Sequence, residues 1–113
     1  MTNIFVFGSN LSGIHGAGSA KEAYINHGAV WGQGVGHHGN SYAIPTRDRS
    51  INTSLELSEV KYYVEEFLDY ARARQDLHFR VVKIGCGLAG FKEYEIAPLF
   101  SNVPENVHLP AGW

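Results

Sequence analysis

The segment NIFVFGSNLSGIHGAGSAKEA, residues 3–23, decides how the fold begins. Its apolar run ends at Gly8, which is typical of a buried strand. A helical pattern begins near Ala17 and extends to residue 28, with Ala20, Ala23 and Tyr24 on its inward side. Between strand and helix lies a loop with three glycines: Gly13, Gly16 and Gly18. Such a loop indicates unusual backbone angles or a close approach of the backbone to another group.

The remaining sequence alternates in the same way between strand and helix patterns. Apolar residues at helical spacing predict a helix over residues 58–74, with Ser58 as its N-cap. A short helix is expected over residues 93–100, with Pro98 in or near its first turn. One strand is expected before a glycine-rich turn at 37–40, and a second at 41–44, where Pro45 ends it. Two more strands are expected at 78–84 and 106–110.

This alternation predicts an α/β fold with a mostly parallel sheet that is covered on both faces. Ligands of such sheets bind at the carboxyl ends of the strands. The glycine loop at 13–18 follows the first strand, and the loop GCGLAG, residues 85–90, follows the strand that ends at Ile84. Both loops should lie at one edge and precede helix starts. Free N–H groups and helix dipoles there can hold a diphosphate.

Composition narrows the classes of function. With 113 residues, the chain has the length of one domain, residues 1–113. The net charge of −2 without a basic block disfavours nucleic-acid binding. No apolar run reaches the roughly eighteen residues of a membrane span, and no signal-peptide pattern opens the chain, so a cytoplasmic protein is expected.

The cysteine, histidine and glycine patterns exclude several kinds of site. Cys86 is the single cysteine, so no internal disulfide can form, and no Cys/His spacing of zinc type exists. We expect neither a metal nor a cofactor. A dinucleotide fingerprint GxGxxG is absent because position 21 is lysine, and no Walker sequence is present. A homo-oligomer stays open, with Trp113 packed on its own fold or on a second subunit.

Two motifs resemble those of the macro domains, which bind ADP-ribose: GSNLSGIHGAGSA at 8–20 and VVKIGCGLAGFKEYEIAPLF at 81–100. The part IGCGL is similar to the branch that contains the terminal ADP-ribose protein glycohydrolase. The order of elements matches over residues 3–109, and the whole chain also resembles small phage and bacterial macro-like proteins. The resemblance implies a three-layer α/β/α domain with a mostly parallel mixed sheet.

The resemblance also implies positions for the ligand. Asn10 would lie near the distal ribose, where its amide can donate to and accept from hydroxyls, although a turn-forming role is as well supported. The two phosphate loops would comprise Gly16, Ala17, Gly18 and Ser19 in the first, and Gly85, Cys86, Gly87, Leu88 and Ala89 in the second.

The sequence departs from the glycohydrolase branch at two positions. Arg47 and Ala89 stand where that branch has a catalytic lysine and aspartate. Arginine stays protonated and is a poor nucleophile, so we do not expect the lysine–aspartate mechanism. Arg47 can instead bind a phosphate in bidentate fashion, or be a solvated surface residue. Asp48 could partly replace the missing acid, or pair with Arg47 or Arg49.

Other residues near the loops leave alternatives open. His15 adjoins the first loop and could contact a phosphate or ribose or act as a base, or be an exposed loop residue. Cys86 fits a small packed thiol better than a nucleophile. Trp31 and Tyr42 can wall the pocket or belong to the core.

The function expected from these observations is binding of an ADP-ribose-type, NAD-derived nucleotide, as a reader or a sequestering protein. The alternative is a hydrolase of an ADP-ribosylated substrate or an ADP-ribose derivative, with His15 and Asp48 as catalytic candidates. A third class is a structural module with an unused cleft.

Overall fold

The computed structural model describes residues 2–113 and shows a five-stranded mixed sheet in the order β2-β3-β1-β4-β5. The strands are β1 (Thr2–Asn10), β2 (Gly36–His38), β3 (Ser41–Arg47), β4 (Leu77–Val81) and β5 (Val107–His108). The helices are α1 (Gly18–Asn26), α2 (Leu57–Ala73) and α3 (Glu93–Ile96), which runs into the 3₁₀ helix η1 (Ala97–Phe100). The β1–β3, β1–β4 and β4–β5 pairs are parallel, and only β2 pairs antiparallel, with β3. The expected mostly parallel sheet is confirmed.

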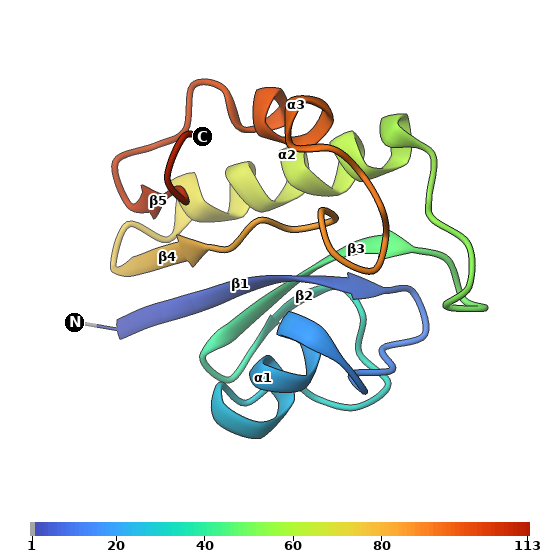
Figure 1. The fold of residues 1–113 in the computed structure, drawn as a ribbon. Helices are drawn as coiled ribbons and strands as arrows, with labels where there is room; N and C mark the ends of the chain where they lie inside the picture. The colour runs from blue at the N-terminus through green and yellow to red at the C-terminus, as the bar shows by residue number, and fades with distance from the viewer. Residues whose placement is uncertain (1) are drawn as a thin grey trace.

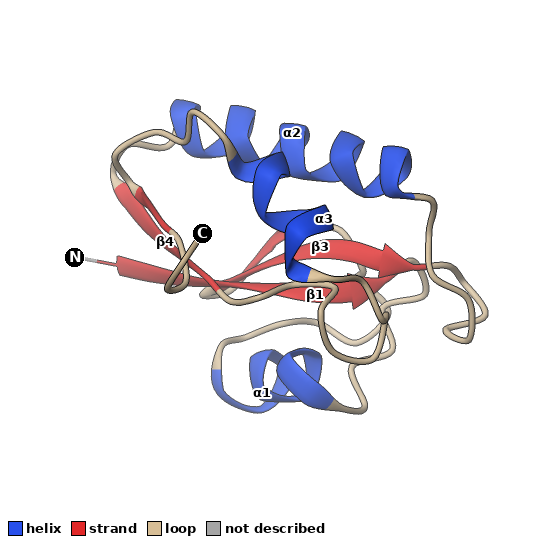
Figure 2. Ribbon diagram, turned by 45° about the horizontal axis from the view of Figure 1, so that its top comes forward, coloured by secondary structure: helices blue, strands red, loops and turns tan. Residues whose placement is uncertain are grey.

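Helices cover both faces of the sheet, with α1 on one side and α2 and α3 on the other (Figures 1 and 2). The central strand β1 explains this arrangement, because its side chains alternate between two apolar layers. Ile4 and Val6 pack in the larger core under α2, and Phe5 and Phe7 pack in a smaller, alanine-rich core under α1. A continuous apolar strand is therefore buried on both faces.

Helix α2 carries the predicted apolar stripe: Val60, Val64, Phe67, Leu68 and Ala71 are all buried. The helix begins at Leu57, and its N-cap is Glu56, two residues before the predicted cap Ser58. The Glu59 side chain reaches back to this cap, and its Oε1 accepts from the Glu56 N–H at 3.2 Å. This bond satisfies the N–H of the cap residue, and Ser58 lies inside the helix.

Some predicted strand limits are wrong, and proline and glycine explain the differences. β3 continues through Pro45 to Arg47, because β2 pairs with it only as far as Ala43 and no partner on that side needs the missing N–H. β4 ends at Val81 rather than Ile84, because the chain turns with an Ile84 N–H to Val82 carbonyl bond of 2.7 Å.

At two other places the expected regular structure is shorter or divided. No strand forms between α1 and β2 within the described chain, and the predicted strand at 106–110 is reduced to the two residues of β5. The predicted helix at 93–100 is divided into α3 and η1, with Pro98 in the first turn of η1 as expected for a residue without an N–H.

The segment between α1 and β2 crosses close to the end of β1. The Gly32 N–H donates to the Gly13 carbonyl at 2.8 Å, and the Ser9 hydroxyl donates to the Gly34 carbonyl. A Cβ at Gly34 would lie 2.0 Å from the Asn10 carbonyl oxygen, so only glycine permits this crossing. The crossing holds the first glycine loop in place from outside.

A buried asparagine joins α2 to the sheet. The Asn106 side-chain amide donates toward the carbonyls of Ala71, Arg74 and Leu77 at 2.9–3.1 Å, while Asn106 itself is only 3% exposed. These carbonyls belong to the end of α2 and the start of β4, where the helix leaves its last acceptors without partners. Asn106 therefore closes the connection between the two elements.

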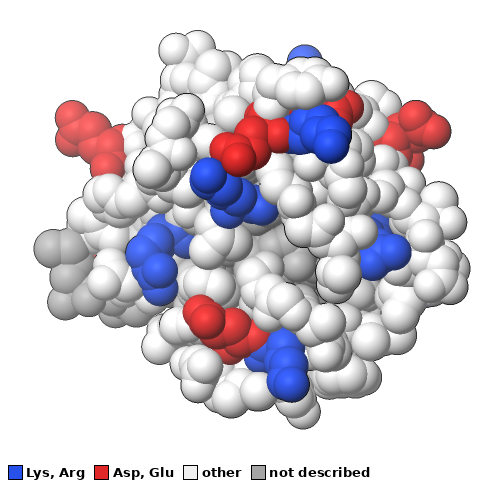
Figure 3. Space-filling view, viewed as in Figure 1, with Lys and Arg blue, Asp and Glu red and all other residues white. Residues whose placement is uncertain are grey.

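Charged side chains of both signs are spread over the face shown in Figure 3. None of the helices that the structure describes is long and apolar enough to cross a membrane. Residues 2–113 also contain no cluster of three or more His, Cys, Asp or Glu side chains that could hold a metal ion.

Candidate functional site

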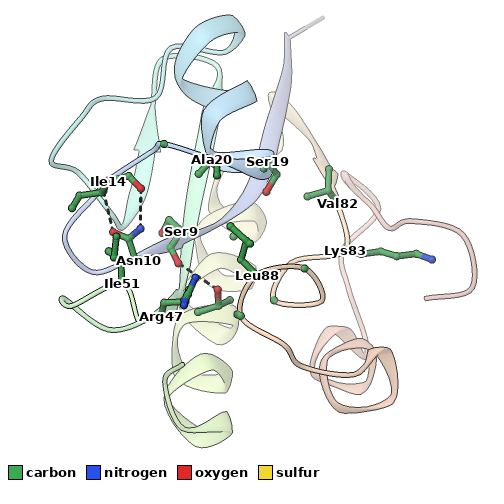
Figure 4. A pocket seen from close by; sticks show the side chains of 18 residues that line it. Ser9, Asn10, Ile14, Ser19, Ala20, Arg47, Ile51, Val82, Lys83 and Leu88 are labelled. Carbon is green, nitrogen blue, oxygen red and sulfur yellow. Dashed lines mark hydrogen bonds between the residues drawn. The ribbon is translucent and has the colours of Figure 1, made fainter. Parts of the chain in front are cut away.

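A pocket of about 630 Å³ lies where β1, β3 and β4 end. The loop between β1 and α1 forms one wall, and the loop after β4 forms another (Figure 4). The prediction that both glycine loops meet at one edge of the sheet is confirmed. The pocket falls within the size range of sites for small ligands.

Ten of the twelve predicted ligand-binding residues line this pocket: Asn10, Gly16, Ala17, Gly18, Ser19, Arg47, Gly85, Gly87, Leu88 and Ala89. The other two, His15 and Cys86, are not among the lining residues, and neither is Asp48. The structure therefore brings together the two predicted loops and the end of β3, and leaves the three reactive side chains outside the lining.

Two pocket glycines are not explained by the fold. Nine of the thirteen glycines have positive φ angles, and Gly8 and Gly34 pack against other backbone. Gly16 and Gly87 remain: their φ angles lie outside the left-handed range, and a Cβ on either would meet nothing within 4 Å. Each lies in a different loop, and both face the pocket. The missing side chains leave space for a ligand that contacts the backbone.

Helix α1 begins at the pocket without a cap of its own. Its N-cap is Ala17, which has no side-chain acceptor, and its first turn contains no acidic residue. The N–H groups of Gly18, Ser19 and Ala20 find no acceptor among the described residues. α2, by contrast, has an acidic residue in its first turn, Glu59, whose Oε1 accepts from the Glu56 N–H. An uncapped helix start presents donors and a positive dipole end to the cavity, which suits an anion.

The second loop is a closed turn whose tip faces the cavity. Gly90 donates to the Gly87 carbonyl at 3.0 Å, Phe91 donates to the Gly85 carbonyl at 2.8 Å, and the Ser54 hydroxyl donates to the Ala89 carbonyl. These bonds fix the loop ends and leave the side chain of Leu88 69% exposed at the rim. The tip therefore combines backbone donors with one apolar side chain.

Arg47 supplies a positive charge at the end of β3. Its Nε atom is buried without a hydrogen-bond partner, and no carboxylate among residues 2–113 forms an ion pair with it. Figure 4 shows its side chain beside Ser9 in the pocket. A buried guanidinium donor without a partner can bind a phosphate of a ligand.

Lys83 is a lining residue that sequence reasoning missed. Figure 4 shows its side chain extending away from the cavity, and its Nζ lies 3.2 Å from the Glu93 carboxylate.

The terminal residue Trp113 packs on its own fold. It donates to the Glu93 carboxylate at 3.0 Å, and its ring packs on Phe100. The bonds from Trp113 and Lys83 lower the pKa of Glu93.

Asn10 adopts the turn-forming role that the sequence left open. Its Oδ1 accepts from the Ile14 N–H and its Nδ2 donates to the Ile14 carbonyl, both at 2.9 Å. Asn10 is buried and lines the pocket, so the amide shapes the first loop from within.

His15 and Asp48 are engaged elsewhere. His15 is 1% exposed, so the exposed-loop alternative is wrong, and its Nε2 lies 3.0 and 3.2 Å from the carbonyls of Val30 and Gln33. Two carbonyl neighbours require that Nε2 carries the proton. Asp48 pairs with no arginine; its Oδ1 accepts from the N–H and hydroxyl of Ser50 at 2.9 and 2.6 Å.

Cys86 and the two candidate aromatic walls have other environments. Burial raises the pKa of the Cys86 thiol, which disfavours the thiolate that a nucleophile requires. Tyr42 is a core residue whose ring lies 4.9 Å from that of Phe67, and burial raises the pKa of Tyr42 to about 12. Trp31 is 52% exposed and does not line the pocket.

Ile51 is a further lining residue that the sequence did not indicate. It lies in the loop after β3 with a φ of 61°, a conformation that strains a β-branched residue. Strained residues of this kind occur preferentially at ligand sites. No local sequence signal identifies it, because only the folded loop brings it to the pocket.

No protein-family model matches the sequence, and a search of curated proteins finds no significant match. The function is therefore inferred from the chemistry of the pocket and from the resemblance of the two motifs.

Proposed function

We propose that this chain is a macro-like domain that binds an ADP-ribose-type, NAD-derived nucleotide and acts as a reader or sequestering protein. The observation that carries the proposal is the pair Gly16 and Gly87, which face the pocket from opposite loops and have no role in packing. Glycine at both positions allows a diphosphate to lie against the backbone of both loops.

The charges around the cavity fit this ligand. Arg47 supplies a guanidinium, the start of α1 supplies uncapped N–H groups, and the side chains that line the pocket from residues 2–113 include no carboxylate. Backbone N–H groups and arginine bind phosphate oxygens through charge-assisted hydrogen bonds. Apolar side chains at the rim, Leu88 and Ile51, offer contacts to the sugar or base.

The positions of the reactive side chains favour binding over hydrolysis. A general base must reach the proton that it removes, directly or through one water. His15 is buried against two carbonyls, and Asp48 caps its own turn. The hydrolase alternative requires one of them to leave its partners. With His15 and Asp48 in these positions, neither side chain lies beside a ligand in the pocket to act as an acid or a base.

Titration calorimetry with ADP-ribose tests the proposal, with adenosine as a ligand that lacks phosphate. We expect binding of ADP-ribose only. Arg47→Gln should weaken it about 10- to 100-fold, the value of a hydrogen bond to a charged group. Arg49→Gln is the matched control, because Arg49 is exposed and lies outside the pocket lining; it should bind like the wild type.

Mass spectrometry of the ligand recovered after incubation separates the two classes of function. Intact ADP-ribose indicates a reader or sequestering protein, whereas cleaved products indicate a hydrolase. Absence of binding at millimolar ADP-ribose, with the protein folded, would reject the proposed ligand.

A further inference from the structure

One continuous stretch of this chain has no charged residue. The stretch runs from residue 23 to residue 46, without Lys, Arg, Asp or Glu, although the chain has nine basic and eleven acidic residues. It includes the second half of α1, the segment that follows, β2, and β3 as far as Thr46. In Figure 3 the lower right of the molecule, where the segment between α1 and β2 runs in Figure 1, is largely white.

Exposed apolar side chains gather in the same stretch. Five of the eight large hydrophobic residues that are exposed among residues 2–113 fall between positions 24 and 35: Tyr24 (46%), Ile25 (63%), Val30 (47%), Trp31 (52%) and Val35 (38%). The rings of Tyr24 and Trp31 pack edge to face, with their centroids 5.4 Å apart. Tyr24, which helical spacing assigns to the inward side of α1, faces solvent instead. We refer to these five side chains as the uncharged face.

The uncharged face continues into an open edge of the sheet. β2 is the last strand on its side, and its pairing with β3 satisfies only one of its edges. Natural proteins usually protect such an edge with lysine or other charges or by keeping the strand short; β2 has three residues, Gly-His-His, and no lysine. An exposed strand edge beside aromatic side chains is a surface that another backbone can extend.

We propose that the uncharged face and the open edge of β2 form a two-fold interface with a second copy of this chain. A two-fold axis brings each patch against its own duplicate, so charges of one sign near the axis would repel. The five side chains carry no charge, and the two charged residues that precede Ile25 by about one turn of α1, Lys21 and Glu22, are of opposite sign. Aromatic enrichment and charge depletion also characterise the centres of protein interfaces.

The area required explains why β2 belongs to the interface. A standard interface covers about 800 Å² of each partner. That is about one-seventh of the 5903 Å² surface of this chain. The proposal therefore joins the five side chains of the uncharged face to the three residues of β2, Gly36–His38. The dimer does not depend on the proposed nucleotide, because none of the five side chains lines the pocket.

Sedimentation or light scattering of the full chain tests the proposal at high micromolar concentration. We expect the wild type to have twice the chain mass of 12.5 kDa. Ile25→Glu and Trp31→Glu should each halve the measured mass, because the substitution places two like charges at the axis. Tyr94→Glu is the matched control: Tyr94 is 78% exposed and lies in α3, outside the face, and this variant should stay dimeric.

Circular dichroism shows whether the variants remain folded, and Ile25→Glu is the safer variant because Ile25 is the most exposed of the five. A wild type of single-chain mass overturns the proposal and leaves the face for a different partner. A dimer that persists in both folded variants also overturns it, because the interface then lies elsewhere.

Discussion

Replacement of Gly16 or Gly87 by alanine separates ligand binding from folding. Both glycines have φ angles outside the left-handed range, and a Cβ on either would meet none of the described residues within 4 Å. Alanine at such a position reduces the conformational freedom of the unfolded chain, so the free energy of unfolding should rise by about 0.4–1 kcal/mol. This gain in the free energy of unfolding is small, but most substitutions lower that free energy instead.

Ligand affinity should change in the other direction. The new methyl group projects into the space that we assign to the diphosphate, and forcing an extra carbon into a packed contact costs typically about 1–3 kcal/mol. This corresponds to about a 5- to 150-fold increase in the Kd for ADP-ribose. Each variant should therefore be as stable as the wild type or more stable, and should bind more weakly.

Gly34→Ala provides the matched control for a glycine that the fold requires. Its Cβ would lie 2.0 Å from the Asn10 carbonyl oxygen, so the backbone must shift. We expect a loss of about 3 kcal/mol in the free energy of unfolding, the upper part of the range for overpacking. Urea denaturation measures the stability of all three variants, and calorimetry measures binding for those that remain folded.

Two results would refute this reasoning. If Gly16→Ala and Gly87→Ala bind ADP-ribose like the wild type, no ligand lies against these loops. If both variants lose several kcal/mol of stability, the glycines serve the fold after all, and the pocket loses its main support as a binding site.

Further predictions concern single residues. Ile51→Asn should raise the free energy of unfolding by about 1 kcal/mol in urea denaturation, because a left-handed conformation costs an L-residue about 1–2 kcal/mol; a fall would show that its side-chain contacts dominate. Asn106→Ala should lower it by about 3 kcal/mol, because three carbonyls lose their donor in two buried bonds and one part-buried bond; a loss within about 0.5 kcal/mol, typical of surface sites, would contradict this. The Cys86 thiol should be alkylated with a pH midpoint above the usual value, because burial raises its pKa; a lower midpoint would indicate an activated thiol. The lowered pKa of Glu93 contributes stability above the pKa of the unfolded carboxyl that is lost as the pH falls through the folded value. Trp113→Phe should weaken this acid dependence in thermal denaturation, and an unchanged pH profile would count against it.

Local sequence patterns predicted the elements that local physics controls. The apolar stripe of α2 follows helical spacing, and the two glycine loops follow apolar strands, so the position of the pocket could be inferred before the fold was known. The same patterns placed the limits of β3 wrongly at Pro45. Whether proline ends a strand depends on the neighbouring strand, and the short pairing of β2 is a long-range fact.

Side-chain roles at the pocket were less predictable. His15 adjoins the first loop in sequence, but the crossing segment after α1 buries its ring and supplies its carbonyl partners. Lys83 and Ile51 were missed because their positions follow from the turn after β4 and the loop after β3. The sequence around a residue says little about where its side chain points, because that direction depends on segments that are distant in the chain.

The missing cap of α1 has a consequence for the free protein. A bound anion would complete the first turn of this helix, so part of the folding energy would be supplied by the ligand rather than by the chain. Stability then rises with ligand concentration as RT ln(1 + [L]/Kd), which is about 2.7 kcal/mol at one hundred times the Kd. If the chain binds a nucleotide as proposed, its unfolded fraction, and with it the exposure to proteolysis, would depend on nucleotide supply.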